Sequence, residues 1–249
     1  MRYIYTIIGA CLLLFPIITF TFYEHFFTAL VVSLLLIIPL NAFAFSTVYH
    51  KLFSHRAFRP KPWVPYAGTL IGVLLFLPSP KTFASQHRMH HKFSDTDKDP
   101  HTPLHGKLTT FFPYIFKNDQ GFCVPPDLQK SITKDIDREY PLLSKITEKM
   151  TVSFLVAFNT ILFFLNIDIF VISLLVVSFN MFLHGYANTF FHKVNKDTSI
   201  TILNMPYGTK YISPEFNHAT HHERASSYDF SNDGAKDWMA PIIEKYLSR

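Results

Sequence analysis

The stretch FFTALVVSLLLIIPLNAFAFSTVY, residues 26–49, contains no Asp, Glu, Lys or Arg and runs directly into HKLFSH, which begins at His50 and ends at His55. At about 1.5 Å per residue, a helix of this length can cross a hydrocarbon core of roughly 30 Å. Three more uncharged stretches are long enough to do the same: residues 3–23, 150–167 and 169–190. The sequence therefore predicts an all-α integral membrane protein with four transmembrane helices.

Short connections pair these four stretches into two helical hairpins. Glu24 and His25 separate the first stretch from the second, and the third meets the fourth at Asn166, Ile167 and Asp168. Connections this short make consecutive helices antiparallel neighbours.

A fifth uncharged stretch, at about residues 63–78, is bracketed by Pro62 and Pro80. Its apolar centre, from Ala67 to Leu77, is too short to span a bilayer, and proline interrupts helices. We expect this segment to be re-entrant or interfacial.

Composition also indicates burial in a membrane. Of the 249 residues, 49% are hydrophobic and only 16% are charged, which excludes an ordinary water-soluble domain and a disordered chain. The two cysteines, Cys11 and Cys123, match neither a disulfide framework nor a CxxC metal spacing. The first span is too long for a secretion signal and lacks a small-residue cleavage site, so we expect it to be retained as an anchor.

Lysine and arginine are distributed unevenly around the four stretches. One of them precedes the first stretch, 15 lie between Tyr49 and Met150, seven follow His192, and the hairpin turns hold none. By the positive-inside rule, both termini and the long central loop are cytoplasmic. Residues 50–149 and 193–249 are therefore predicted to form a cytosolic cap within a single domain, residues 1–249.

The formal net charge of +5 favours contact with anionic lipid headgroups. No motif for RNA or DNA binding accompanies the charge, so no nucleic-acid partner is expected. Among membranes, we expect a bacterial inner membrane rather than the endoplasmic reticulum.

Eight of the 13 histidines fall into three tight groups on the predicted cytoplasmic side. They are His50 and His55, then His87, His90 and His91, then His218, His221 and His222. On a helix, HxxHH spacing places positions i, i+3 and i+4 on one face, so the imidazoles can converge on a metal. A single interfacial histidine often does no more than contact headgroups, but three clusters on one side favour a metal site.

Eight or nine imidazoles are too many for one tetrahedral zinc ion, and the chain has no HExxH motif. Divided between two ions, they give each four or five nitrogens and leave positions for oxygen ligands. Imidazole suits iron, so the pattern predicts a dinuclear iron site at the cytoplasmic membrane surface. We expect His25 to be an ordinary loop residue, and His101 and His105 to support the site rather than bind metal.

With these motifs, the chain resembles the integral-membrane fatty-acyl desaturases, in particular the stearoyl-CoA desaturase type that introduces a first double bond. The matching motifs are HxxxxH at His50 and His55, HRMHHKFSDTDKDPH from His87 to His101, and a final box in which Glu215 precedes His218 by three residues. The resemblance extends from His50 to about Tyr228.

This resemblance implies four membrane helices under a cytosolic helical cap, with nine histidine ligands to two irons and an asparagine that holds one ion through water. It also implies O2 as co-substrate and electrons from a separate donor, such as cytochrome b5, ferredoxin or a similar carrier. The substrate would be a long acyl chain carried as acyl-CoA, acyl-lipid or acyl-ACP.

The last span offers two candidates for the ninth histidine ligand, His184 and His192, each preceded by an asparagine at position i−4. His184 lies eight residues deeper, about 12 Å along a helix, which carries it away from clusters at the cytoplasmic surface. We therefore choose His192 as the ligand and Asn188 as its water-mediated companion. The Asn-Ser/Thr-x-x-His element of the resembled family also matches Asn188 to His192.

Three carboxylates follow the second histidine group, at Asp95, Asp97 and Asp99. A metal-bound imidazole normally donates its other N–H to an acceptor, so these side chains could orient the ligands. The alternative, that they cap and solvate a loop, remains equally open.

The predicted function is O2-dependent introduction of a cis double bond into a long saturated acyl chain. An alkane C–H bond has no polarity for acid–base chemistry, so a metal–oxygen oxidant is required, and the protein positions the chain in a narrow apolar tunnel. One alternative is a membrane hydroxylase or decarbonylase with a similar iron pair. A metal transporter is an alternative of another class, disfavoured because transport ligands lie near the bilayer midplane.

Overall fold

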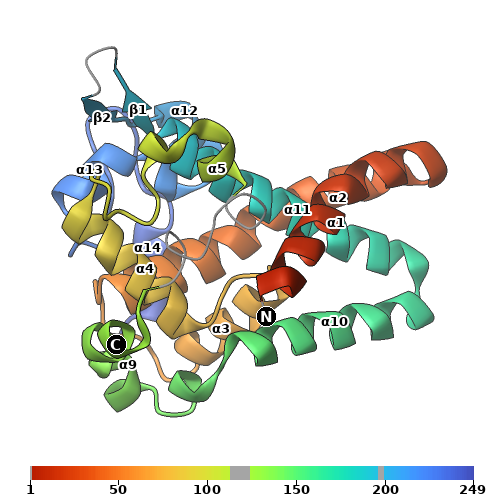
Figure 1. The fold of residues 1–249 in the computed structure, drawn as a ribbon, viewed down its shortest axis with the longest axis horizontal. Coiled ribbons are helices and arrows are strands. Elements are labelled where there is room, and N and C mark those ends of the chain that lie inside the picture. Colours follow the sequence, from red (N-terminus) through yellow and green to blue (C-terminus); the bar gives the residue numbers. More distant parts are fainter. Residues whose placement is uncertain (1, 113–123, 196–198) are drawn as a thin grey trace.

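The computed structural model describes residues 2–112, 124–195 and 199–249. Cys123, the remainder of residues 113–123 and residues 196–198 of the predicted cap lie outside the described residues, as does the side chain of His105. The chain is mostly helical. Long apolar helices project from one end of the molecule, and shorter helices gather at the other end (Figure 1).

The first hairpin forms where it was predicted. Helix α1 spans Arg2–Phe22 and α2 spans Phe26–Leu40, with the turn at Glu24 and His25. At this end of the molecule, the Tyr23 hydroxyl donates a hydrogen bond to Asp168 of the second hairpin. The two predicted turns therefore lie beside each other.

Helix α2 does not end at residue 49 but continues without a break as η1, a π-helix over Asn41–Ser54. Pro39, just before the change, has no N–H and so cannot make the α-helical backbone hydrogen bond. In η1 the bonding partner moves from i−4 to i−5, as when the amide of His55 donates to the carbonyl of His50 over 3.2 Å. The helix therefore continues past the predicted span, residues 26–49, and carries His50 itself.

The second hairpin consists of α10, Glu148–Leu165, and α11, Ile167–Phe190. Side chains cap both helix starts: Thr147 accepts from the amide of Met150, and Asn166 accepts from the amide of Ile169. Asn166 also ends α10, which produces the tight turn that the sequence predicts.

Three helices of the described residues are long and apolar enough to cross a membrane. They are Phe26–Ser54, Glu148–Leu165 and Ile167–Phe190. Helix α1, counted over Thr6–Phe22, is one of the shorter apolar helices. Helix α3, Val64–Leu74, is another and lies within the predicted interfacial segment.

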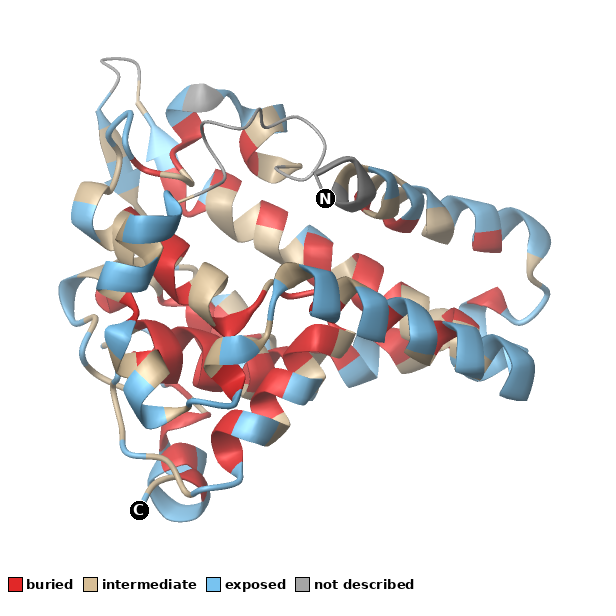
Figure 2. Cartoon of the chain, turned by 60° about the horizontal axis from the view of Figure 1, so that its bottom comes forward, coloured by how far each residue is buried: buried red, intermediate tan, exposed pale blue. Residues whose placement is uncertain are grey.

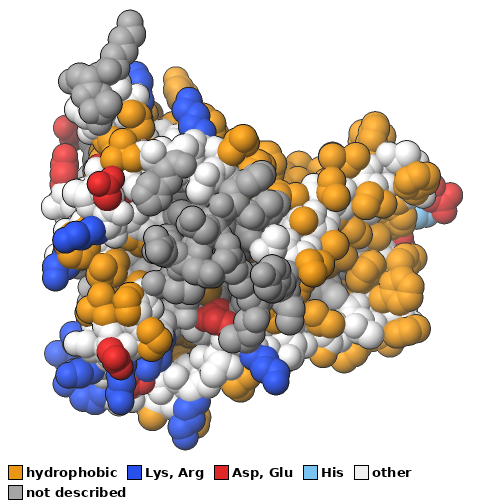
Figure 3. Space-filling view, in the orientation of Figure 1, with side chains coloured by type: hydrophobic (Ala, Val, Ile, Leu, Met, Phe, Trp, Pro, Cys, Tyr) orange, Lys and Arg blue, Asp and Glu red, His pale blue; other side chains and the backbone are white. Residues whose placement is uncertain are grey.

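The projecting helices expose large apolar side chains, which suits a lipid environment. Phe22 is 83% exposed, and Phe164 is 79% exposed near the turn of the second hairpin. Hydrophobic side chains cover this end of the molecule, while lysine and arginine gather at the opposite end (Figure 3). Buried residues concentrate between these two regions (Figure 2).

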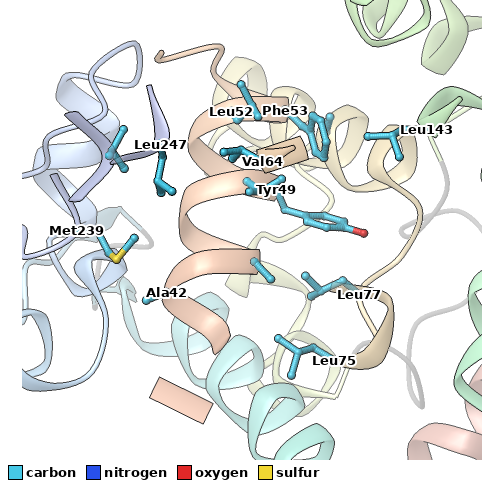
Figure 4. Packing of buried hydrophobic residues seen from close by; sticks show 14 of the residues in the cluster. Ala42, Tyr49, Leu52, Phe53, Val64, Leu75, Leu77, Leu143, Met239 and Leu247 are labelled. Atoms are coloured by element: carbon cyan, nitrogen blue, oxygen red, sulfur yellow. The ribbon is translucent and has the colours of Figure 1, made fainter. Parts of the chain in front are cut away.

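The main core forms around η1 (Figure 4). Tyr49 and Phe53 of η1 are fully buried and pack with residues such as Val64 and Leu143. Helix α3 approaches η1 so closely that a Cβ atom at Gly68 would lie only 2.3 Å from a Val48 methyl. This packing fixes the helix that carries the first two predicted ligands.

The cap is built from short elements that hold the histidine motifs. Its helices are α4 Pro80–Phe93, α5 Lys107–Phe111, α8 Pro126–Ile132, α9 Lys134–Glu139, α12 Pro206–Tyr211, α13 His218–Glu223 and α14 Ala240–Ile242. Shorter turns are η2 Pro103–His105, η3 Leu143–Lys145 and η4 Pro214–Phe216, and a second π-helical segment, η5, covers Ile243–Leu247.

Two short strands correct the prediction of a purely helical chain. Strand β1, His192–Val194, pairs antiparallel with β2, Ile200–Ile202, so that His192 lies opposite Ile202. Helix α11 ends at Phe190, and His192 is therefore not one helical turn beyond Asn188 as the i,i+4 interpretation assumed. The error arose because the uncharged run continues past the point where the chain leaves the helix.

Candidate metal centre

Nine imidazoles meet in two adjacent groups. The five-histidine group contains His50, His55, His87, His91 and His221, and the four-histidine group contains His90, His192, His218 and His222. Within each group, one ring nitrogen of every member lies within 4.8 Å of the corresponding nitrogen of every other member. All nine predicted histidine ligands fall in these groups, and His184 falls in neither.

Each HxxHH motif divides its histidines between the two groups. In α4, His87 and His91 face the five-histidine group while His90 faces the other. In α13 the arrangement is reversed, with His218 and His222 in the four-histidine group and His221 in the five-histidine group. Around a helix axis, the side chain at i+4 lies about 40° to one side of the side chain at i, and the side chain at i+3 lies about 60° to the other side. The histidines of one HxxHH motif can therefore face two different groups.

The π-helix η1 explains the five-residue separation of His50 and His55. On an α-helix these positions would lie about 140° apart, whereas the i→i+5 repeat of a π-helix stacks them. Their ring centroids are 5.0 Å apart, and both belong to the five-histidine group. The HxxxxH spacing was thus a local signal for a π-helix that the sequence interpretation missed.

His192 completes the four-histidine group. Its Nε2 lies 2.9 Å from Nε2 of His218. His184, one candidate for the same role, lies deeper in α11, where its Nε2 is buried without a hydrogen-bond partner and its ring contacts Phe45. Asn188 lines the same cavity as His90 and His218 of the four-histidine group and His50 and His87 of the five-histidine group.

Three carboxylates lie next to the Nδ1 atoms of clustered imidazoles, on the side of each ring away from the neighbouring Nε2 atoms. Asp99 lies 2.9 Å from Nδ1 of His90, and Asp95 lies 2.9 Å from Nδ1 of His192. Accepting from Nδ1–H fixes the tautomer whose Nε2 lone pair points into the group. Asp97, by contrast, is exposed.

Glu215 is the third such carboxylate, and sequence reasoning used it only as a motif residue. It is buried, accepts a hydrogen bond from the Ser46 hydroxyl, and lies 2.5 Å from Nδ1 of His50. Burial raises the pKa of Glu215, but the proximity of His50 and then Lys51 outweighs that effect and lowers it. Its position three residues before His218 was the signal available in the sequence.

Burial lowers the pKa values of six of the nine clustered imidazoles and so favours their neutral form. Desolvation, reinforced by the neighbouring imidazoles, lowers the pKa of His55 and of His91 to about 2. The same causes lower the pKa values of His87, His218, His221 and His222. Neutral imidazole is the form that binds metal ions, and several inward lone pairs without a cation would repel one another.

The pKa of Asp99 is lowered, whereas burial alone raises the pKa of a carboxyl group. Burial raises its pKa, but the hydrogen bond and charge interaction with His90 outweigh this and hold it at about 2. Asp99 is therefore ionised at neutral pH and attracts the Nδ1 proton of His90. It also accepts from the backbone amide of His101, which fixes the loop that follows α4.

Distances between the ligand nitrogens fit metal coordination. The Nε2 atoms of His55 and His87 are 2.8 Å apart, and those of His90 and His222 are 3.2 Å apart. Two imidazole nitrogens each about 2.1 Å from one ion lie about 3.0 Å apart at a right angle and about 3.4 Å apart at a tetrahedral angle. Both observed distances are of the size expected for two imidazole nitrogens that share one ion.

A cavity borders both groups. Its walls include His87 of the five-histidine group and His90 of the four-histidine group, together with apolar surface from Phe45, Leu77 and Ala187. An apolar chain in this cavity would lie against both candidate metal sites at once.

The model of the fatty acid desaturase family matches residues 25–231, which is most of the chain. Among curated proteins of Arabidopsis thaliana, Delta-9 acyl-lipid desaturase 1 is 28% identical over 106 residues, covering 43% of this chain and 34% of that protein. Delta-9 desaturase-like 4 protein is 33% identical over 82 residues, covering 33% of this chain and 27% of that protein.

A third relative is chloroplastic palmitoyl-monogalactosyldiacylglycerol delta-7 desaturase, also of Arabidopsis thaliana. It is 35% identical over 68 residues, covering 27% of this chain and 18% of that protein. The alignments thus span about a third or less of these relatives' own length. The family match, by contrast, includes both histidine groups in full. The chain belongs to the membrane fatty acid desaturase family.

Proposed function

We propose that this chain is an O2-dependent fatty-acyl desaturase that introduces a cis double bond into a long saturated acyl chain at a pair of iron ions. The observation that carries the proposal is the division of nine buried or half-buried imidazoles into two adjacent groups beside one partly apolar cavity. Family membership supports the same conclusion.

The five-histidine group would hold one iron through five nitrogens, and the four-histidine group would hold the other. The second ion has one nitrogen fewer, and Asn188, which lines the same cavity as His218, would contribute through a water molecule. Several protein nitrogens with room for an oxygen ligand suit iron, and a group of five nitrogens exceeds the four ligands of a tetrahedral zinc ion.

Iron bound at these groups would supply the O2-dependent oxidising power that removes hydrogen from an unactivated C–H bond, which acid–base side chains cannot do. The protein's own residues would orient the imidazoles and hold the acyl chain in place. Glu215, Asp95 and Asp99 keep the Nδ1 protons on three imidazoles, and so keep the Nε2 lone pairs directed inward. Phe45, Leu77 and Ala187 would fix the acyl chain by apolar contact and exclude water.

The proposed membrane arrangement has four spans, residues 3–23, 26–49, 150–167 and 169–190, with the segment at 63–78 interfacial. Both termini and the cap, residues 50–149 and 193–249, would be cytoplasmic, in a bacterial inner membrane. The basic surface at the cap end supports this orientation (Figure 3). The same surface offers a docking site for an acidic electron carrier, such as cytochrome b5, ferredoxin or a similar protein.

For the acyl carrier, the relatives' names favour a membrane lipid. One is an acyl-lipid desaturase, and another has palmitoyl-monogalactosyldiacylglycerol in its name. A lipid-bound acyl chain could enter from the bilayer beside the projecting helices, with no need for a soluble carrier protein.

Expression in a host that lacks its own desaturase, followed by analysis of fatty-acid double bonds, tests this function. The expected result is a new monounsaturated acyl chain that is absent when His90 is replaced by Ala, while the His25→Ala control behaves as the unaltered chain. Hydroxylated fatty acids or alkanes instead would indicate a hydroxylase or a decarbonylase. Metal accumulation without any change in lipid would indicate a transporter.

A further inference from the structure

Arg88 lies within the second histidine motif, between two ligands, yet its guanidinium group points away from both histidine groups. It reaches the end of η1, where Nε donates to the carbonyl of Ser54 over 2.9 Å and Nη2 donates to that of Phe53 over 2.6 Å. It also donates to the carbonyl of Ile132 at the end of α8. One side chain thus joins three elements of the cap.

The remaining N–H groups of Arg88 bind Asp135 of α9. Nη1 lies 2.8 Å from Oδ1, and Nη2 lies 2.6 Å from Oδ2, which is a two-pronged ion pair. With these two bonds, all five N–H donors of the guanidinium group are used. The side chains are 20% and 13% exposed, so solvent competes little for either partner.

The carbonyls that Arg88 binds are those that a helix end leaves without partners. Two of them belong to Phe53 and Ser54, the residues directly before His55 of the five-histidine group. Arg88 itself follows His87, whose Nε2 lies 2.8 Å from Nε2 of His55. Arg88 therefore bridges the ends of the two chain segments whose imidazoles must meet.

We propose that Arg88 is a positioning residue for the metal ion of the five-histidine group. Its hydrogen bonds to the carbonyls of Phe53 and Ser54 hold the end of η1 against α4. The ion pair with Asp135 holds the Arg88 side chain in that position. This inference rests on the proposed function, since it takes a metal ion at each group. A lysine could keep the charge at position 88, but its single nitrogen cannot bond two carbonyls and grip a carboxylate in one plane.

The effect should be selective for one metal site. Three of the four members of the other group, His192, His218 and His222, lie on β1 and α13, and none of the hydrogen bonds of Arg88 within the described residues goes to these elements. The fourth member, His90, shares α4 with Arg88 but is separately held by Asp99. Loosening the end of η1 therefore displaces His55 and leaves the four-histidine group in place.

Iron release from the purified, iron-loaded full chain to a ferrous chelator tests the proposal. The unaltered chain should release two irons slowly. In Arg88→Lys, one iron should leave about 10- to 100-fold faster while the other leaves at the original rate, because that is the usual effect of losing a group that orients metal ligands. Arg138→Lys is the matched control, because Arg138 is 74% exposed and, among the residues that the structure describes, forms an ion pair only with Glu139.

A double substitution identifies which iron is affected. His55→Ala weakens the five-histidine site directly, so adding Arg88→Lys to it should change the release kinetics no further. If Arg88→Lys does not fold, Asp135→Asn carries the same test, because it removes the charge that grips the guanidinium group. It should accelerate the release of the same single iron.

Three results would overturn the proposal. Release of both irons at the original rate from Arg88→Lys would show that position 88 need not be arginine, and equal acceleration of both irons would show a general scaffold role. An unaltered chain that binds fewer than two irons would overturn the proposed function first, and the role of Arg88 with it.

Discussion

The imidazole rings of His91 and His222 stack with their centroids 4.3 Å apart, although they belong to different histidine groups. His91 comes from α4 and His222 from α13, so this contact joins the two HxxHH helices directly. The two candidate metal sites therefore share a wall. Under the proposed function, ions held by the two groups would lie close together, and both groups border one cavity.

Replacing His192 by Ala should remove one iron per chain and abolish turnover, because His192 supplies one of only four nitrogens to its group. His184→Ala should keep both irons, since His184 belongs to neither group. Metal analysis of the two purified variants checks this. Loss of iron from His184→Ala with both irons kept in His192→Ala would mean that the ninth ligand lies deeper in the membrane.

The aspartates after the second histidine motif provide a test with an internal control. Asp95→Asn and Asp99→Asn should each weaken iron binding by about 10- to 100-fold, because each removes the charged acceptor for a ligand Nδ1–H. Asp97→Asn should bind iron like the unaltered chain, because Asp97 is exposed. Competition with a chelator measures all three, and three equal affinities would contradict the assigned roles.

Acid should destabilise the iron-free protein. An unfolded histidine takes up a proton below about pH 6.5, whereas burial lowers the pKa of folded His55 and His91 to about 2. The unfolded state therefore binds more protons throughout this window, so the free energy of unfolding falls as pH falls from about 6.5 toward 2.

Thermal unfolding of the iron-free protein in detergent, at several pH values from 7.5 down to 5, checks this prediction. The melting temperature should be level above pH 7 and should drop below about pH 6.5. A melting temperature that rises on acidification would mean that the imidazoles are charged in the folded protein.

Membrane topology can be tested by labelling single cysteines. In a background without the two native cysteines, Arg59→Cys and Lys98→Cys should react with an impermeant reagent from the same side of the membrane. Both positions lie in the proposed cytoplasmic cap, on either side of α3, and α3 is too short to cross by itself. Labelling from opposite sides would mean that the segment containing α3 spans the bilayer.

Much of the fold followed from the length and charge of the apolar runs. The turn at Glu24 and His25 and the turn at Asn166 lie where the sequence predicts them, because so few residues separate long uncharged runs. The π-helix did not follow, since hydrophobic periodicity over residues 41–54 does not reveal a change from i−4 to i−5 bonding. His192 was likewise assigned to a helix that in fact ends at Phe190.

The histidines of the site were predictable because HxxxxH and HxxHH are local spacings. Their division between two groups was not, because it depends on how α4 and α13 face each other in space. Glu215 and Arg88 act through partners far away in the sequence, at Ser46, His50 and Asp135. Contacts of that kind leave no periodic signal in a single sequence.

The most direct test of two iron ions held by nine imidazoles is the metal content of the purified, active chain. Iron and zinc should be measured together, per mole of protein, by elemental mass spectrometry. The prediction is two irons per chain and no stoichiometric zinc, since groups of five and four imidazole nitrogens suit iron. One zinc per chain without iron, in protein that still acts on acyl chains, would contradict it.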